Sequence, residues 1–355
     1  MIKKEICLIL SICGLLLLSC SKRQEYVDSQ SCSYNSLAES EVINLHGKKV
    51  DFDVEIKNPV SLYCIDSVLL LNNRNNAVFL DRYNLNTKKF MGSCIPFGSG
   101  PNELLIVKQL QRCNSSVWLF DQMQQKLYQY KLPGFYMDKK PKPSRCITLE
   151  EQAYSFSVVP SNDIIAMSFN MNDKRFSIYD MSGKLIGRIG NYPQFGEEMT
   201  KYEKIESFFG NMVLSCDNKN IIVAYQQTDL IEIYDTNGEL KTRMHGPDHF
   251  FPTLKQKGSG DRIGVSPQYG KTRDAFVCPV CFQDEVWLLY SGKVYDPKVP
   301  QFYLDTCILV FNMKGEFIRK YNLDIPIFSF TIDSINHKIY ALTEHPEIEV
   351  VEFRF

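Results

Sequence analysis

The chain has 355 residues, with 40 basic and 41 acidic side chains, so its formal net charge is −1. No basic block breaks this balance, which argues against a nucleic-acid partner. Aromatic residues reach 12%, which favours strands, and all-β folds of this length often form one unit.

The N-terminus predicts export and lipid anchoring. Lys3 and Lys4 precede an apolar run over 6–18, which is too short to span a membrane but fits the central region of a secretory signal. The run ends in Leu17-Leu18-Ser19-Cys20, which resembles the bacterial lipobox. The resemblance implies cleavage after residues 1–19 and acylation of Cys20, whose acyl chains would hold the protein on a membrane. An ordinary signal peptide or an uncleaved anchor with a chance cysteine is the alternative.

The segment after Cys20 is polar and has little Val, Ile or Leu before Leu37. Such a composition favours a flexible tether over 20–40, with the folded domain over 41–355. The residue after the lipid cysteine, Ser21, is typical of outer-membrane lipoproteins. We therefore expect an exported protein that is anchored to the outer membrane, faces the periplasm, and meets the membrane only through its lipid.

The rest of the chain repeats one pattern six times. Each copy has a polar turn pair followed by a short apolar strand that starts at a β-branched residue. These residues are Val68, Val117, Ile164, Ile221, Val286 and Ile339. A period of about 50 residues with several strands per unit is typical of propeller blades. The sequence therefore predicts an all-β, six-bladed β-propeller with four strands per blade.

Turn and strand signals fill in each blade. Ser182-Gly183, Asn237-Gly238 and Lys314-Gly315 supply the positive φ that tight hairpins need, so the third and fourth strands should pair across them. Apolar runs over 208–214, 275–282 and 328–332 fit inner first strands. No convincing amphipathic helix is found. The last blade lacks a fourth strand, and we expect Glu41–Leu45 to complete it and close the ring.

One segment carries a family resemblance. Phe97-Gly98-Ser99-Gly100-Pro101-Asn102-Glu103 resembles the Gly-x-Gly-Pro-x-Glu signature of TolB-like six-bladed propeller lipoproteins of Gram-negative bacteria. Together with the lipobox and the six repeats, the resemblance covers nearly the whole chain. Gly98, Gly100, Pro101 and Glu103 read as a structural turn, because glycine permits positive φ and proline fixes φ. A phosphate-binding loop would need a following helix and a Gly-Lys-[Ser/Thr] end.

The cysteines give no clear site. Excluding Cys7, Cys13 and Cys20, the remaining nine are too sparse for a disulfide scaffold, and their pairing stays open. The pair Cys278-Pro279-Val280-Cys281 could be a redox pair or half of a zinc site. Its flanks read as strand rather than helix, and no second pair exists. We therefore expect inner-strand cysteines with a proline bulge.

The segment His245–Asp274 is the first candidate for a contact surface. It is the longest excursion between predicted strands, and it is rich in basic and glycine residues. Its candidate binding residues are His245, His249, Lys255, Arg262 and Arg273. The two histidines could bind a metal, but His residues four apart share a face only on a helix, and Gly246-Pro247 argues against one. We expect neither a metal nor another cofactor, and a tolerated insertion without a role is the alternative.

No catalytic constellation stands out. The paired acids, such as Glu150-Glu151 and Asp284-Glu285, would point to opposite faces of a strand, and no Gly-x-Ser-x-Gly motif is present. The favoured hypothesis is an envelope lipoprotein whose propeller binds an unknown protein or glycan. A Ca²⁺-dependent hydrolase of the lactonase type and a structural component of a larger complex are the alternatives. Converging carboxylates in the channel would favour the hydrolase, and an exposed apolar patch on one rim would favour a protein partner.

Overall fold

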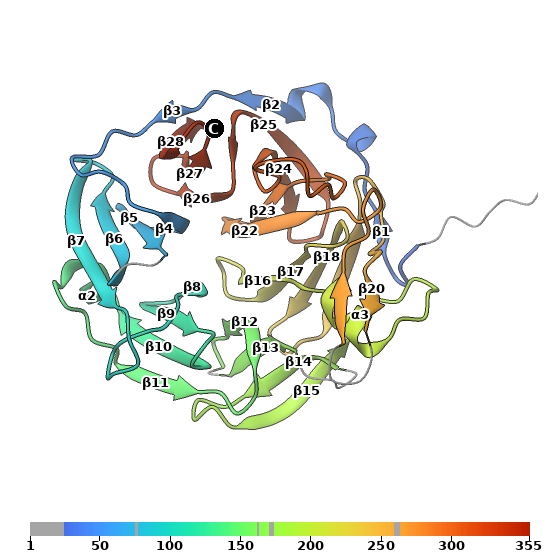
Figure 1. Cartoon of the computed structure of the whole chain (residues 1–355), viewed down its shortest axis with the longest axis horizontal. Helices are drawn as coiled ribbons and strands as arrows, with labels where there is room; N and C mark the ends of the chain where they lie inside the picture. The colour runs from blue at the N-terminus through green and yellow to red at the C-terminus, as the bar shows by residue number, and fades with distance from the viewer. Residues whose placement is uncertain (1–24, 75–76, 162, 170–173, 259–262) are drawn as a thin grey trace, which may run out of the picture.

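Six sheets stand around a central axis in the computed structural model, which describes residues 25–74, 77–161, 163–169, 174–258 and 263–355 (Figure 1). Each of the first three blades has four strands that follow one another in sequence and in space. Their strands are β4 (Pro59–Ile65), β5 (Val68–Asn73), β6 (Val78–Asn84) and β7 (Lys89–Pro96); β8 (Gln109–Cys113), β9 (Ser116–Asp121), β10 (Lys126–Lys131) and β11 (Arg145–Thr148); and β12 (Ala153–Val158), β13 (Ile164–Ser168), β14 (Lys174–Tyr179) and β15 (Leu185–Asn191).

The last three blades repeat this order and accept additional strands from the N-terminal segment. Their own strands are β16 (Gly210–Leu214), β17 (Asn220–Tyr225), β18 (Leu230–Asp235) and β19 (Leu240–His245); β22 (Phe276–Phe282), β23 (Glu285–Tyr290), β24 (Asp305–Asn312) and β25 (Phe317–Ile327); and β26 (Ser329–Asp333), β27 (Lys338–Glu344) and β28 (Ile348–Arg354). The predicted six-bladed, four-stranded architecture is confirmed. The six repeated apolar strands are the second strands of the blades.

The hairpin prediction is confirmed as well. The third and fourth strands of blades three to five pair antiparallel across turns in which Gly183, Gly238 and Gly315 have φ of 87°, 79° and 84°. A residue with a β-carbon rarely adopts this conformation, so glycine at these turns sets the register of the outer strands.

The core lies between neighbouring blades. Phe120 of blade two packs on Phe156 of blade three with ring centroids 5.6 Å apart, and Phe176 of blade three packs on Tyr234 of blade four at 4.9 Å. All four side chains are almost fully buried. Burying each such aromatic side chain contributes about 1.5–3 kcal/mol, so the contacts between blades stabilise the ring.

Two short helices interrupt the strands, although none was predicted. They are α2 (Gly134–Met137) and α3 (Lys201–Ser207). Thr200 and Glu203 form a capping box at the start of α3, because each side chain accepts a hydrogen bond from the other residue's backbone N–H. This Thr-x-x-Glu signal is present in the sequence and was missed. None of the helices in the described residues has the length and apolar character that a membrane span requires.

The ring closes differently from the prediction for Glu41–Leu45. The strand β2 (Val42–Leu45) pairs parallel with β25 at the outer edge of blade five, so the prediction that it joins the last blade is wrong. The next strand, β3 (Lys48–Lys49), pairs antiparallel with β28 and completes blade six. The outer edges of blades five and six both offer unpaired backbone groups to an added strand. The N-terminal segment reaches blade five first, so β2 pairs there and the following strand completes blade six.

The expected flexible tether over 20–40 is also wrong for its second half. The strand β1 (Gln30–Ser31) pairs parallel with β19, and two 3₁₀ turns follow, η2 (Tyr34–Ser36) and η3 (Glu39–Glu41). We call residues 26–49 the N-terminal belt, because they run along the outside of blades four, five and six in turn (Figure 1). Tyr26 and Cys32 are only 3% and 6% exposed, so apolar burial holds the belt despite its polar composition. Cys20 and the predicted signal peptide lie outside the described residues.

Most of the long connections lie on one face of the ring. Because strands alternate in direction, the links between blades and the links from second to third strands emerge at the same end of the sheets. We call this end the upper face. It carries the long connections 97–108, 192–209, 246–275 and 291–304, and the opposite end is the lower face, which carries the connection 132–144 with α2.

Candidate functional site

The predicted contact loop begins with a turn that a buried carboxylate holds in place. Asp229 is fully buried, and its carboxylate accepts hydrogen bonds from the backbone N–H groups of Asp248, His249 and Phe250 at 2.7, 2.8 and 3.0 Å. The side chain of His245 lies 3.3 Å from the same carboxylate and is also buried. His249 has φ of +57°, a left-handed conformation that these hydrogen bonds stabilise.

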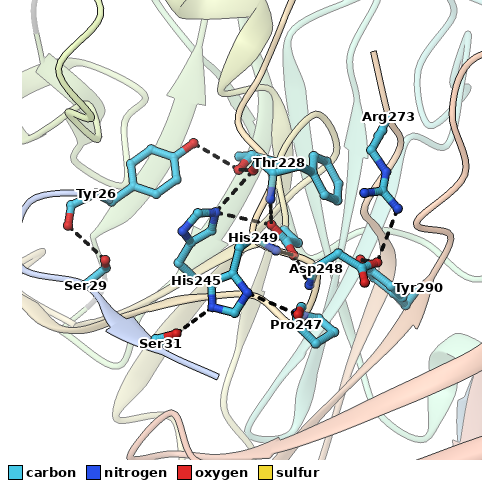
Figure 2. Close-up of polar contacts among 12 residues, drawn as sticks. Tyr26, Ser29, Ser31, Thr228, His245, Pro247, Asp248, His249, Arg273 and Tyr290 are labelled. Atoms are coloured by element: carbon cyan, nitrogen blue, oxygen red, sulfur yellow. Dashed lines mark hydrogen bonds and ion pairs between the residues drawn. The ribbon is translucent and has the colours of Figure 1, made fainter. Parts of the chain in front are cut away.

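The two histidines also contact the N-terminal belt (Figure 2). The hydroxyl of Ser31 contacts Nε2 of His249, and the backbone N–H of Cys32 donates to the carbonyl of His245 at 3.0 Å. Gly246 has no room for a side chain, because a β-carbon would lie 2.3 Å from the carbonyl oxygen of Cys32. The histidines therefore fasten the belt to the turn. No group of three or more His, Cys, Asp or Glu side chains able to hold a metal occurs in the described part of the chain.

The remaining predicted loop residues are dispersed. Arg273 donates to the carbonyl of Gly292 at 2.7 Å, pairs with Asp248 at 3.4 Å and lies over the ring of Phe250 (Figure 2). Lys255 is exposed on a small hairpin formed by β20 (Lys255–Lys257) and β21 (Gly264–Ser266), away from this cluster. Arg262 lies outside the described residues.

The loop is therefore largely folded rather than open. The carboxylate of Glu203 on α3 accepts the backbone N–H of Gln256 at 3.0 Å, which joins the β20–β21 hairpin to the preceding connection. Sequence reasoning missed three residues that organise the loop, namely Asp229, Tyr26 and Tyr290, whose hydroxyl donates to Asp248 at 2.6 Å. Their partners are distant in sequence, and nothing near them in the chain marks their role.

The Gly-Pro-Glu motif forms a loop closed on itself. The carboxylate of Glu103 accepts the backbone N–H of Gly100 at 2.9 Å, and a β-carbon on Gly98 would lie 2.0 Å from that carboxylate. The backbone N–H of Gly98 also donates to the carbonyl of Leu104 at 2.9 Å. Pro101 begins the turn between Gly100 and Glu103. These contacts are those of a loop scaffold.

The motif loop borders a cavity that the sequence did not reveal. The cavity has a volume of about 970 Å³, and the first strands of all six blades contribute to its wall. Phe97 lies at the start of the motif loop and Lys108 at the end of the same connection, and both line the cavity. The motif therefore positions two of the cavity's wall residues, and the cavity opens on the upper face.

The lining is aromatic and basic. Tyr63, Phe79, Phe97, Tyr154 and Phe328 supply rings, and the only charged lining residues among those described are Arg74 and Lys108. The side chain of Lys108 is exposed to solvent, and the protein around it lowers the pKa of its ammonium group by desolvation. No described lining residue is a carboxylate, so these walls offer no acidic ligands for Ca²⁺.

One member of the Cys-x-x-Cys pair, Cys278, lines the same cavity, whereas Cys281 is not among the lining residues. Cys278 and Cys281 both belong to the inner strand β22, with a register shift between Val277 and Val280, which confirms the strand-and-bulge prediction. Burial raises the pKa of both thiols, and no disulfide joins them. A protonated thiol is a poor nucleophile and a poor metal ligand.

Comparisons with known proteins agree with this architecture. The family model described as "TolB-like 6-blade propeller-like" matches residues 38–335. A Bacteroides fragilis protein described as exported is similar in structure, with a TM-score of 0.54, 12% identity, and coverage of 92% of this chain and 98% of its own.

A member of the DUF4221 family from Bacteroides vulgatus is similar at a TM-score of 0.53 and 9% identity, over 93% of this chain and 97% of its own. At these identities the likeness shows the fold alone. No protein of curated function matches the sequence. The extent of the family match, taken with six four-stranded blades, shows that the chain belongs to the TolB-like six-bladed propeller family.

Proposed function

We propose that the protein is an exported, lipid-anchored envelope protein whose propeller binds its partner through the upper face. The observation that carries this proposal is the gathering of three features on that face. The upper face carries most of the long connections and the mouth of the cavity. It also carries most of the strongly exposed large apolar side chains, when those of the belt and the outer strands are set aside. An excess of exposed apolar side chains on one face favours an interaction surface there.

The two faces differ in a way that folding alone does not require. The upper face exposes Phe97, Met123, Tyr202, Tyr269, Val294, Val299 and Tyr303, whereas the lower face exposes Met137 and Ile335. A propeller needs only a few residues to pass between blades, so the long upper connections are additional to the scaffold. The lower face therefore provides an internal control for the upper one.

The anchor supports the envelope location. The lipobox-like segment ends at Cys20, and the first buried residue of the belt is Tyr26. If Cys20 carries the lipid, the five residues between them span at most about 20 Å, so the propeller would stay close to the membrane. Replacing Cys20 with Ala should move the protein from the membrane fraction to the soluble fraction. A Cys20→Ala protein that still sediments with membranes would contradict the anchor.

Site-specific photocrosslinking in cells tests the binding face. A photoreactive residue at Phe97 or Met123, which are 55% and 70% exposed, should give a discrete adduct. The matched positions Met137 and Ile335 on the lower face are 62% and 60% exposed and should not. Equal adducts from both faces, or adducts only from the lower face, would overturn the proposal.

The hydrolase alternative has less support. A Ca²⁺ site needs several oxygen ligands with carboxylates among them, and the described lining residues provide none. Two cations in the wall would in addition repel a metal ion.

A further inference from the structure

The central cavity has the chemistry of a binding site for a small organic anion. We propose that it takes a saccharide bearing a carboxylate or a phosphate, with Lys108 and Arg74 as the groups that contact the negative charge. This inference rests on the proposed binding role of the upper face and names the ligand class.

The first argument is the charge of the wall. Arg74 and Lys108 are the two charged residues among the described lining residues, and both are basic. Other cations of this protein pair with carboxylates, as Lys57 does with Asp81 at 3.3 Å. Within the described residues, the side chains of Arg74 and Lys108 have no ion pair or hydrogen bond. Two unpaired cations in one cavity favour an anionic occupant.

The second argument concerns the acids nearest to the wall. Asp121 is buried behind the lining and accepts the backbone N–H groups of Leu105, Met123 and Gln124 at 2.6, 3.0 and 3.0 Å. Asp81 is likewise buried and accepts the amide of Asn73 at 2.9 Å. Both carboxylates serve the protein's own donors and are not among the residues that line the cavity. Neither carboxylate forms an ion pair with Arg74 or Lys108 among the described residues.

The third argument concerns shape and the rest of the lining. A volume of about 970 Å³ lies at the upper end of the range for small-molecule sites, about 300–1,000 Å³. The five aromatic side chains provide flat apolar surfaces, and the amide of Asn211 has no partner among the described residues. A sugar presents hydroxyls to an amide and apolar C–H faces to rings, and a carboxylate or phosphate group meets the cations.

Isothermal titration calorimetry on the purified full-length protein in detergent tests the proposal. The probes are glucuronate, glucose 6-phosphate and uncharged glucose. At least one anion should bind, and glucose should bind at least tenfold more weakly. Whether glucuronate or glucose 6-phosphate binds more tightly distinguishes a carboxylate ligand from a phosphate ligand.

Variants then assign the contacts. Lys108→Met and Arg74→Gln should each weaken binding at least tenfold, whereas Lys108→Arg, which keeps the charge, should retain it within a few-fold. Lys140→Met removes an exposed lysine on the lower face and is the matched control, with no change expected.

Three outcomes would overturn the inference. The first is that neither anion binds at ~10 mM, a concentration that reveals even millimolar affinity. The second is that glucose binds as tightly as the anions, and the third is that Lys108→Met keeps wild-type affinity. The photocrosslinking result is independent of these. Adducts from Phe97 without anion binding would refute only the ligand class, whereas anion binding without upper-face adducts would refute the proposed partner surface.

Discussion

Replacing Tyr26 tests whether the N-terminal belt belongs to the folded propeller. Its ring is 3% exposed and lies against Phe195, His245 and Phe251 at centroid distances of 5.2, 4.8 and 4.9 Å. Its hydroxyl donates to Thr228 at 2.9 Å. Truncating a buried aromatic side chain costs about 3–5 kcal/mol of unfolding free energy, so Tyr26→Ala should lose that amount. Tyr26→Phe keeps the packing and loses one hydrogen bond, which should cost only about 1 kcal/mol.

Urea unfolding followed by tryptophan fluorescence measures these differences, because both tryptophans, Trp118 and Trp287, are buried. The neighbouring Val27 is 53% exposed, so Val27→Ala is the matched control and should stay within about 0.5 kcal/mol of wild type. If Tyr26→Ala unfolds like Val27→Ala, residues near 26 are not part of the cooperative unit, and the belt is a tether after all.

Three further predictions concern the interior. Glu232 is fully buried and pairs with Arg243 at 2.6 Å, so Glu232→Gln should cost about 3–5 kcal/mol in urea unfolding by leaving a buried cation without its partner; a loss under about 1 kcal/mol would refute this. Gly98→Ala should lower the melting temperature more than Gly264→Ala, because a β-carbon at Gly98 meets the Glu103 carboxylate, whereas one at Gly264 meets nothing within 4 Å and the φ of Gly264 is not positive; equal melting temperatures would contradict the motif geometry. In the native protein a thiol reagent at pH 8 should label the two exposed cysteines, Cys146 and Cys216, before the others. Burial raises the pKa of several of the remaining thiols, so rapid labelling of all nine described cysteines would contradict the structure.

The sequence by itself determined the blades. Alternating strands, a repeat of about 50 residues and glycines at hairpin turns are local signals, because strand period and positive φ depend on a few adjacent residues. The same locality allowed the inner-strand bulge at Cys278 to be predicted. It also means that α3 was predictable from Thr200 and Glu203, whose capping box is a four-residue pattern.

Only the tertiary structure decided the belt, the loop and the cavity. Tyr26 is buried because His245 and Phe251, more than two hundred residues later, form its pocket. The polar composition of this segment predicted a tether, because composition gives the number of apolar residues but not the surface on which they pack. Likewise, Lys108 and Arg74 read as ordinary surface cations in sequence. They face one cavity because the closed ring brings upper-face connections around a common axis, and no local pattern encodes that convergence.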